Sequence, residues 1–256
     1  MQRRGEAMAN ASVDSAVTEF GAGCSWAIFQ AYALSVPLAL ETFGYGVPSY
    51  LTDVVTAVSL VVAIAAFQLA LYSEGAPNAA VHLGLYVGGK ETSILTSTRK
   101  IVSTILGSVV GSVFARDTLT WVGVSAEGMK PPVTHYPELG DNLVLGIETA
   151  TSLVICALAV LVLPSRPILG LAGLFLVPVP AAIVGVPGID PAWSLGRAFA
   201  AKDFENNALY LVGPFAGALA FGVACHAGVK LGALRGGAKP KRKRRKSAAA
   251  SKKKTT

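Results

Sequence analysis

Long runs without a charged side chain limit most strongly what this chain can fold into. Four such runs of about twenty residues lie at 20–40, 54–72, 168–186 and 206–229. A helix of that length crosses the hydrocarbon core of a bilayer. A mean hydropathy of +0.54 with only 14% charged residues is also outside the range of soluble domains. The chain is therefore predicted to be an all-α membrane protein.

Two further runs are weaker candidates for spanning helices. Residues 101–115 are too few unless the helix continues past the charged Arg116 and Asp117 towards Trp121, and residues 142–163 contain Glu148. With both included the chain has six spans. No pattern at its start resembles a cleavable signal peptide, so 20–40 is expected to remain the first span.

The charge is concentrated at the C-terminal end. Residues 239–256 carry ten Lys and Arg and no acid, so the rest of the chain has a net charge of −3. Six spans place both termini on one side, and 18 of the 22 Lys and Arg then fall on that side, which predicts that it is cytosolic. We expect a disordered tail that contacts anionic lipid, and nucleic acid is an unlikely partner for a segment tethered so close to a span. Lys253 and Lys254 resemble a dilysine retrieval signal, which points to the endoplasmic reticulum or another intracellular membrane and leaves the plasma membrane open.

Two short apolar stretches do not fit a model of spanning helices. Residues 78–87 and 190–199 are each about ten residues long, too short to cross a bilayer. Each opens with an Asx residue that can cap a helix, Asn78 in the first and Asp190 in the second, where Pro191 follows at the first helical position. Both stretches are predicted to be re-entrant half-helices.

The two halves of the chain repeat the same order of features. Glu19 and Glu148 each lie early in a span, a half-helix follows in each half, and residues 106–111 match residues 212–217 as small-residue segments. Three spans per half is an odd number, so the second half is inverted and the half-helices meet N-terminus to N-terminus near the midplane. We expect the two buried carboxyls to accept hydrogen bonds from backbone N–H groups of the re-entrant loops.

The order of these motifs resembles the aquaporin family, the major intrinsic proteins. The pair Glu19-Phe20 is similar to the family's Glu-Phe in the first helix, residues 75–81 and 188–192 resemble its two Asn-Pro-Ala loops, and residues 211–218 resemble its sixth helix. The resemblance implies six tilted spanning helices and two half-helices in an inverted repeat. It also implies a homotetramer and passive passage of water or small uncharged solutes through each subunit.

The resemblance divides the chain into three parts. We expect a cytosolic N-terminal arm over residues 1–17, a channel domain over 18–230 with repeats of about 18–123 and 142–230, and a polybasic cytosolic tail over 231–256. No nucleophile, base and orienting acid occur at a recognisable spacing, so we expect no enzyme activity. The three cysteines are scattered through apolar stretches, so we expect no metal site and no cofactor.

Three departures from the family pattern fall on the expected pore. Ala79 replaces a proline, Asp190 replaces an asparagine, and Trp193 replaces the filter arginine. Whether Arg197, one helical turn away, substitutes for that cation stays open. A carboxylate accepts hydrogen bonds but donates none, so proton exclusion becomes uncertain. The pore residues implied by the resemblance are Asn78, Ala79, Ala80, Asp190, Pro191, Ala192, Trp193, Ser59 and Pro187, with Val177 or Pro178 contributed by the fifth span.

Two alternatives stay open at this point. The pore is either a conducting channel with altered selectivity, or it is closed by the Trp193 ring in a protein with a structural or lipid-contact role. His82, where the family has threonine, is either a satisfied polar residue of the first half-helix or a pH-sensitive gate, since an imidazole titrates near pH 6.5.

Overall fold

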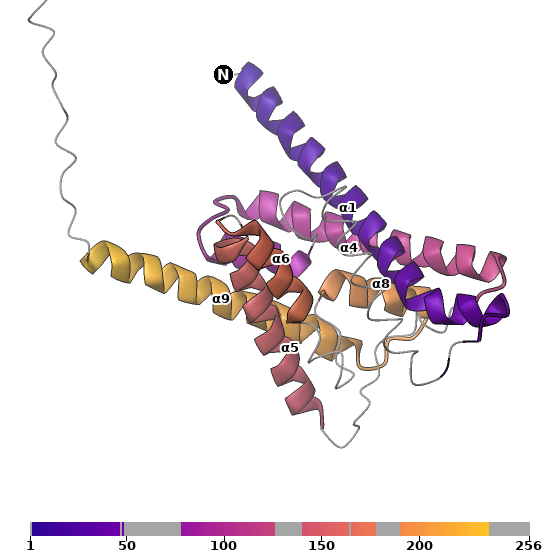
Figure 1. The fold of residues 1–256 in the computed structure, drawn as a ribbon. Coiled ribbons are helices and arrows are strands. Elements are labelled where there is room, and N and C mark those ends of the chain that lie inside the picture. The colour runs from indigo at the N-terminus through magenta and orange to yellow at the C-terminus, as the bar shows by residue number, and fades with distance from the viewer. Residues whose placement is uncertain are drawn as a thin grey trace, which may run out of the picture.

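The structure, a computed structural model, describes residues 2–46, 48, 78–125, 140–163, 165–177 and 190–235. Every regular element within these residues is a helix (Figure 1). The predicted second span, the pore positions Ser59, Pro178 and Pro187, and the tail beyond residue 235 lie outside the described residues.

The described residues contain four helices that are long and apolar enough to cross a membrane. They belong to α1 (Gln2–Thr42), α4 (Ile94–Trp121), α5 (Gly140–Ala157) with the π-helical turn η3 (Leu158–Val162), and α9 (Asn207–Arg235). These four coincide with the predicted first, third, fourth and sixth spans. A shorter helix, α6 (Pro167–Leu176), covers the first part of the predicted fifth span.

The third span continues past its charged pair, as predicted. Arg116 donates hydrogen bonds to the carboxylate of Asp117 at 2.8 and 2.6 Å and to the carbonyl of Ala200 at 2.8 Å. These bonds satisfy the guanidinium locally, so α4 remains helical to Trp121. The predicted N-terminal arm is likewise helical from Gln2 and continues into α1, which extends beyond the other helices in Figure 1.

Two helices are too short to cross a bilayer. These are α3 (Ala79–Val87), with nine residues, and α8 (Pro191–Ala201), with eleven. The extended backbone at Asn78 and Asp190 makes each residue the N-cap of its helix, as the sequence predicted. The two half-helices therefore begin where the Asx residues place them.

Each half-helix packs on the long helices of the opposite repeat. Ala200 of α8 is buried in one cluster with Ala31 of α1 and Ala115 of α4. Ala80 of α3 is buried in another cluster with Ala218 and Phe221 of α9 and Cys156 of α5. This exchange interlocks the repeats, because each half-helix completes a core that its own half does not supply.

Glycines set the close crossings within each repeat, where α1 packs on α4 and α5 on α9 (Figure 1). A Cβ at Gly107 would collide with the Phe20 carbonyl, and a Cβ at Gly217 would collide with the Thr149 carbonyl. Phe20 and Thr149 are equivalent, since each follows the buried glutamate of its repeat. The predicted match of residues 106–111 with 212–217 is therefore one helical turn out of register, because the contacts relate Gly107 to Gly217 and not to Gly213.

Candidate functional site: the junction of the two half-helices

The N-termini of α3 and α8 meet in the interior. The side chain of Asn78 accepts hydrogen bonds from the backbone N–H of Ala80 at 2.9 Å and of Val81 at 3.4 Å. The side chain of Asp190 accepts one from the N–H of Ala192 at 3.0 Å, and the backbone of Ala79 lies beside the same carboxyl. Both caps are only 6% exposed. The structure thus brings Asn78 and Asp190 to one buried junction, as the inverted repeat predicted.

The wall of this junction is small and apolar. Ala79, Ala80, Pro191 and Ala192 are fully buried around the two caps. Pro191 occupies the first position of α8, where its missing N–H leaves no unsatisfied donor. Ala79 stands at the corresponding place in α3, and the helix still starts there without a proline. The departure at Ala79 therefore leaves the local fold intact.

Asp190 has one carboxylate oxygen that the described residues leave unsatisfied. Oδ1 serves as the cap of α8, whereas Oδ2 is buried and makes no hydrogen bond to any described residue. The side chain of Trp26 on α1 borders the same carboxyl. The backbone N–H groups of Ala79 and Trp193 also lie beside this carboxyl, so donors from both half-helices surround it.

Trp193 and Arg197 form a stacked pair on α8. The guanidinium carbon of Arg197 lies 4.7 Å from the centroid of the Trp193 ring, and the residues are only 7% and 5% exposed. This is the geometry of a cation–π contact away from water. Arg197, the alternative cation one turn beyond the lost filter arginine, is thus held over the aromatic ring. Its position on the pore axis stays a prediction.

Further unsatisfied polar atoms lie near α8. They include Trp193 Nε1, Ser112 Oγ on α4 and Gln30 Oε1 on α1, all buried and without a hydrogen bond to the described residues. Ser112 lies directly against Gly196 of α8. Donors and acceptors both occur in this set.

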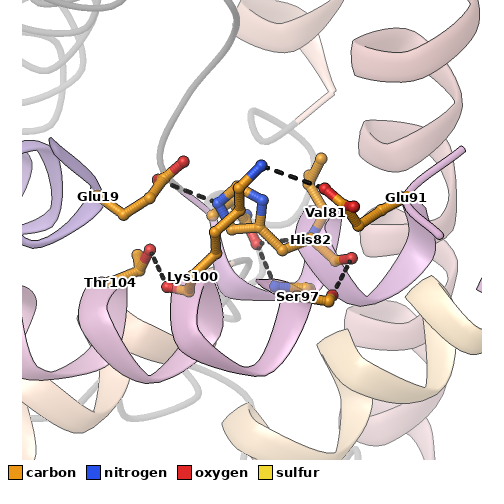
Figure 2. A network of polar contacts seen from close by, with 9 residues as sticks. Glu19, Val81, His82, Glu91, Ser97, Lys100 and Thr104 are labelled. Carbon is orange, nitrogen blue, oxygen red and sulfur yellow. Dashed lines mark hydrogen bonds and ion pairs between the residues drawn. The ribbon is translucent and has the colours of Figure 1, made fainter. Parts of the chain in front are cut away.

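Glu19 pairs with His82, as Figure 2 shows. The Glu19 carboxylate lies 3.1 Å from the Nε2 atom of His82, and both side chains are buried. The hydroxyl of Ser97 on α4 donates to the His82 backbone carbonyl at 3.1 Å. These contacts fix α3 against α1 and α4. They explain the burial of His82 and favour its interpretation as a satisfied structural residue.

The equivalent glutamate of the second repeat has a different environment. Glu148 is fully buried on α5, and Tyr210 on α9 is 1% exposed. One turn after Tyr210, Gly213 of α9 packs directly on the Glu148 side chain. Sequence reasoning missed Tyr210. The signal that could have found it is its place one turn before the Gly213-Pro214 segment of the sixth span.

The remaining predictions concern absences and one flanking residue. The described residues contain no group of three His, Cys, Asp or Glu that could hold a metal ion, and all three cysteines are free thiols. Val177 ends α6 as its C-cap.

Comparisons with known proteins agree with this architecture. The sequence model of the major intrinsic protein family matches residues 7–225. The chain belongs to the major intrinsic protein family. Members of this family are channels and not enzymes, so the chain is an integral membrane protein with the aquaporin-like helical fold.

One solved structure is similar over almost its whole length. It is the X-ray structure of the aquaglyceroporin from Plasmodium falciparum, with a TM-score of 0.61, 16% sequence identity, and coverage of 87% of this chain and 99% of that chain. At this identity the similarity supports the fold and not the permeant. No curated protein matches the sequence.

Proposed function

We propose that the chain forms a passive transmembrane channel for water and small uncharged solutes, with a selectivity altered by Asp190 and Trp193. The observation that carries the proposal is the buried junction at which the N-terminal caps of α3 and α8 meet. Half-helices directed at one point orient polar molecules through their dipoles and cap side chains.

The proposed constrictions use the residues at and near this junction. Asn78 and Asp190, with the alanine and proline walls around them, form the central constriction. Trp193 forms the outer one together with Ser59 and Pro187, which belong to the expected pore. The buried glutamates Glu19 and Glu148 have a structural role. No metal or cofactor takes part.

The proposed setting follows from charge and family. The channel is a homotetramer with one pore per subunit, and both termini are cytosolic. The polybasic tail contacts anionic lipid of an intracellular membrane, since about ten cationic residues near a surface each add about 1 kcal/mol of attraction.

A second candidate is a non-conducting protein of the same fold. The observation that favours it is the burial of Trp193 under Arg197, which places a large ring where the family pattern has an extended arginine. In this case the structural or lipid-contact role belongs to the fold and the tail, and no solute passes.

Stopped-flow measurements on proteoliposomes separate the two candidates. The panel contains water, glycerol, urea, ammonia and hydrogen peroxide, and compares the wild type with Trp193→Ala. A channel predicts flux in the wild type above empty vesicles, whereas a closed pore predicts flux only in the variant. Trp121→Ala is the matched control, because Trp121 is 87% exposed at the end of α4. No flux of any solute in either protein would overturn a channel role.

A further inference from the structure

A pair of charged residues interrupts the apolar part of α4. Between Lys100 and Trp121 this helix carries only two charges, Arg116 and Asp117. Charges within a spanning segment are costly, and where they occur they usually serve a function. The Asp117 side chain is 61% exposed, whereas the Arg116 side chain is 27% exposed. Arg116 is therefore the member of the pair that is turned towards the protein.

The hydrogen bonds of Arg116 join α4 to the second half-helix. Nε and Nη2 donate to the carboxylate of Asp117 at 2.8 and 2.6 Å. Nη1 donates to the backbone carbonyl of Ala200 on α8 at 2.8 Å. Two bonds to one carboxylate restrict the planar guanidinium to few orientations, so Asp117 directs Nη1 at α8.

The carbonyl that Arg116 binds belongs to the last turn of α8. The last carbonyls of a helix have no partner within the helix. The N–H groups of Lys202 and Asp203 satisfy those of Phe199 and Ala198, whereas Ala200 takes its donor from α4. A cation at a helix C-terminus is also attracted by the helix dipole. Arg116 therefore caps the C-terminal end of α8 from a neighbouring helix.

This bond fixes the register of α8 along α4. One turn earlier, a Cβ at Gly196 would meet the hydroxyl of Ser112. Gly196 and Ala200 are four residues apart, and so are Ser112 and Arg116, so the two helices keep one register over a full turn. Ala115, next to Arg116, is buried in one cluster with Ala200. Sliding of α8 along α4 would break the bond and the packing together.

We propose that Arg116 is a positioning residue for solute selection, which holds α8 and with it the stacked Trp193 and Arg197 of the expected outer constriction. Asp117 is its orienting partner. This inference rests on the proposed function, since selectivity requires an open pore. Arg116 acts through α8 and does not touch the permeating molecule.

Stopped-flow measurements of the glycerol-to-water permeability ratio in proteoliposomes test this role, because the ratio does not depend on how many channels are active. Arg116→Met keeps an unbranched side chain and removes the donors. Release of α8 leaves the Trp193 ring less fixed, so the ratio is expected to rise about threefold or more. Arg116→Lys keeps a cation that can donate to the Ala200 carbonyl, so it should restore the ratio towards the wild-type value.

Arg166→Met is the matched control, because Arg166 is exposed and its side chain does not cap α6. A folded Arg116→Met protein with the wild-type ratio would overturn the positioning role, and so would equal effects of the Met and Lys changes. Asp117→Ala leaves the guanidinium in place without its orienting carboxylate, and should raise the ratio by less. It decides the question if Arg116→Met does not fold.

Tryptophan fluorescence separates this inference from the proposed function. If the wild type passes neither glycerol nor water, the proposed function fails, and the position of α8 is measured without flux. In a Trp121→Phe background the remaining tryptophans, Trp26 and Trp193, are both 5% exposed. Arg116→Met should increase their quenching by acrylamide, whereas Arg166→Met should not. Unchanged quenching in Arg116→Met would overturn the inference whether or not the pore conducts.

Discussion

Replacing Gly196 by alanine tests whether the position of α8 is set by its contact with α4. A Cβ at residue 196 would lie 2.6 Å from the backbone carbonyl oxygen of Ser108 and 2.6 Å from the hydroxyl oxygen of Ser112. Ordinary contacts of this kind begin at 3.4 Å, so the two helices are about 0.8 Å too close for a methyl group. The Ser112 hydroxyl can rotate away, but the Ser108 carbonyl is fixed within α4.

The expected result of Gly196→Ala follows from two opposed terms. Overpacking of a buried contact costs about 1–3 kcal/mol, and the higher helix propensity of alanine returns about 1 kcal/mol. Because the colliding atom belongs to the backbone, we expect a net loss near the upper end, about 2 kcal/mol. For a domain of this size that lowers the melting temperature by about 4–8 °C.

Thermal unfolding of the detergent-solubilised protein, followed by size-exclusion chromatography, measures this shift, and proteoliposome flux measures its effect on the pore. Moving α8 carries Trp193 and Arg197 with it, so solute permeability should change as well. Gly146→Ala is the control, since a Cβ at this exposed position of α5 would meet no atom within 4 Å. A Gly196→Ala protein with wild-type stability and wild-type flux would refute the argument that this contact positions α8.

Two further substitutions test polar contacts that join distant elements. Glu19→Ala leaves the buried His82 ring without its carboxylate and should lower the free energy of unfolding by about 1–3 kcal/mol. The double variant Glu19→Ala/His82→Ala should cost less than the sum of the two single changes, and additive costs in this double-mutant cycle would contradict the pairing. Ser152→Ala removes the 2.8 Å hydrogen bond to the Pro214 carbonyl and should lower the free energy of unfolding by about 0.5–1.5 kcal/mol in the same melting assay. Ser165→Ala is the control, because the exposed Ser165 hydroxyl bonds only to its own turn and its loss should be neutral. Equal effects of the two changes would show that the Ser152 bond adds no stability.

Local features explain what the sequence could predict. The length of an apolar run decides whether a helix can span a bilayer, and an Asx residue before such a run decides where the helix begins. Both signals are contained in a few neighbouring residues. The first residues of α3 and α8 were accordingly predictable from Asn78 and Asp190. The continuation of α4 towards Trp121 was predictable from the length that a span needs.

Contacts between distant segments were not predictable in the same way. Glu19 and His82 were each singled out, but they are 63 residues apart, and no spacing rule pairs them. The register of the repeat failed for a related reason. A glycine shifted by four residues stays on the same helix face, so the pattern does not distinguish Gly213 from Gly217. Only the crossing point of two helices, set by packing, decides which glycine meets the Thr149 carbonyl.

The two repeats differ within their half-helices, α3 and α8, to which the proposed channel owes its selectivity. Counting from the caps Asn78 and Asp190, the residue equivalent to His82 is Ser194, which is fully buried in α8. The first half therefore pairs its glutamate with a residue on its own half-helix. The second half has a serine at that place, and its buried cation, Arg197, lies over the Trp193 ring. Asp190 is in none of the ion pairs of the described residues, so for the proposed channel we expect substitutions in α8 to change selectivity more than equivalent ones in α3.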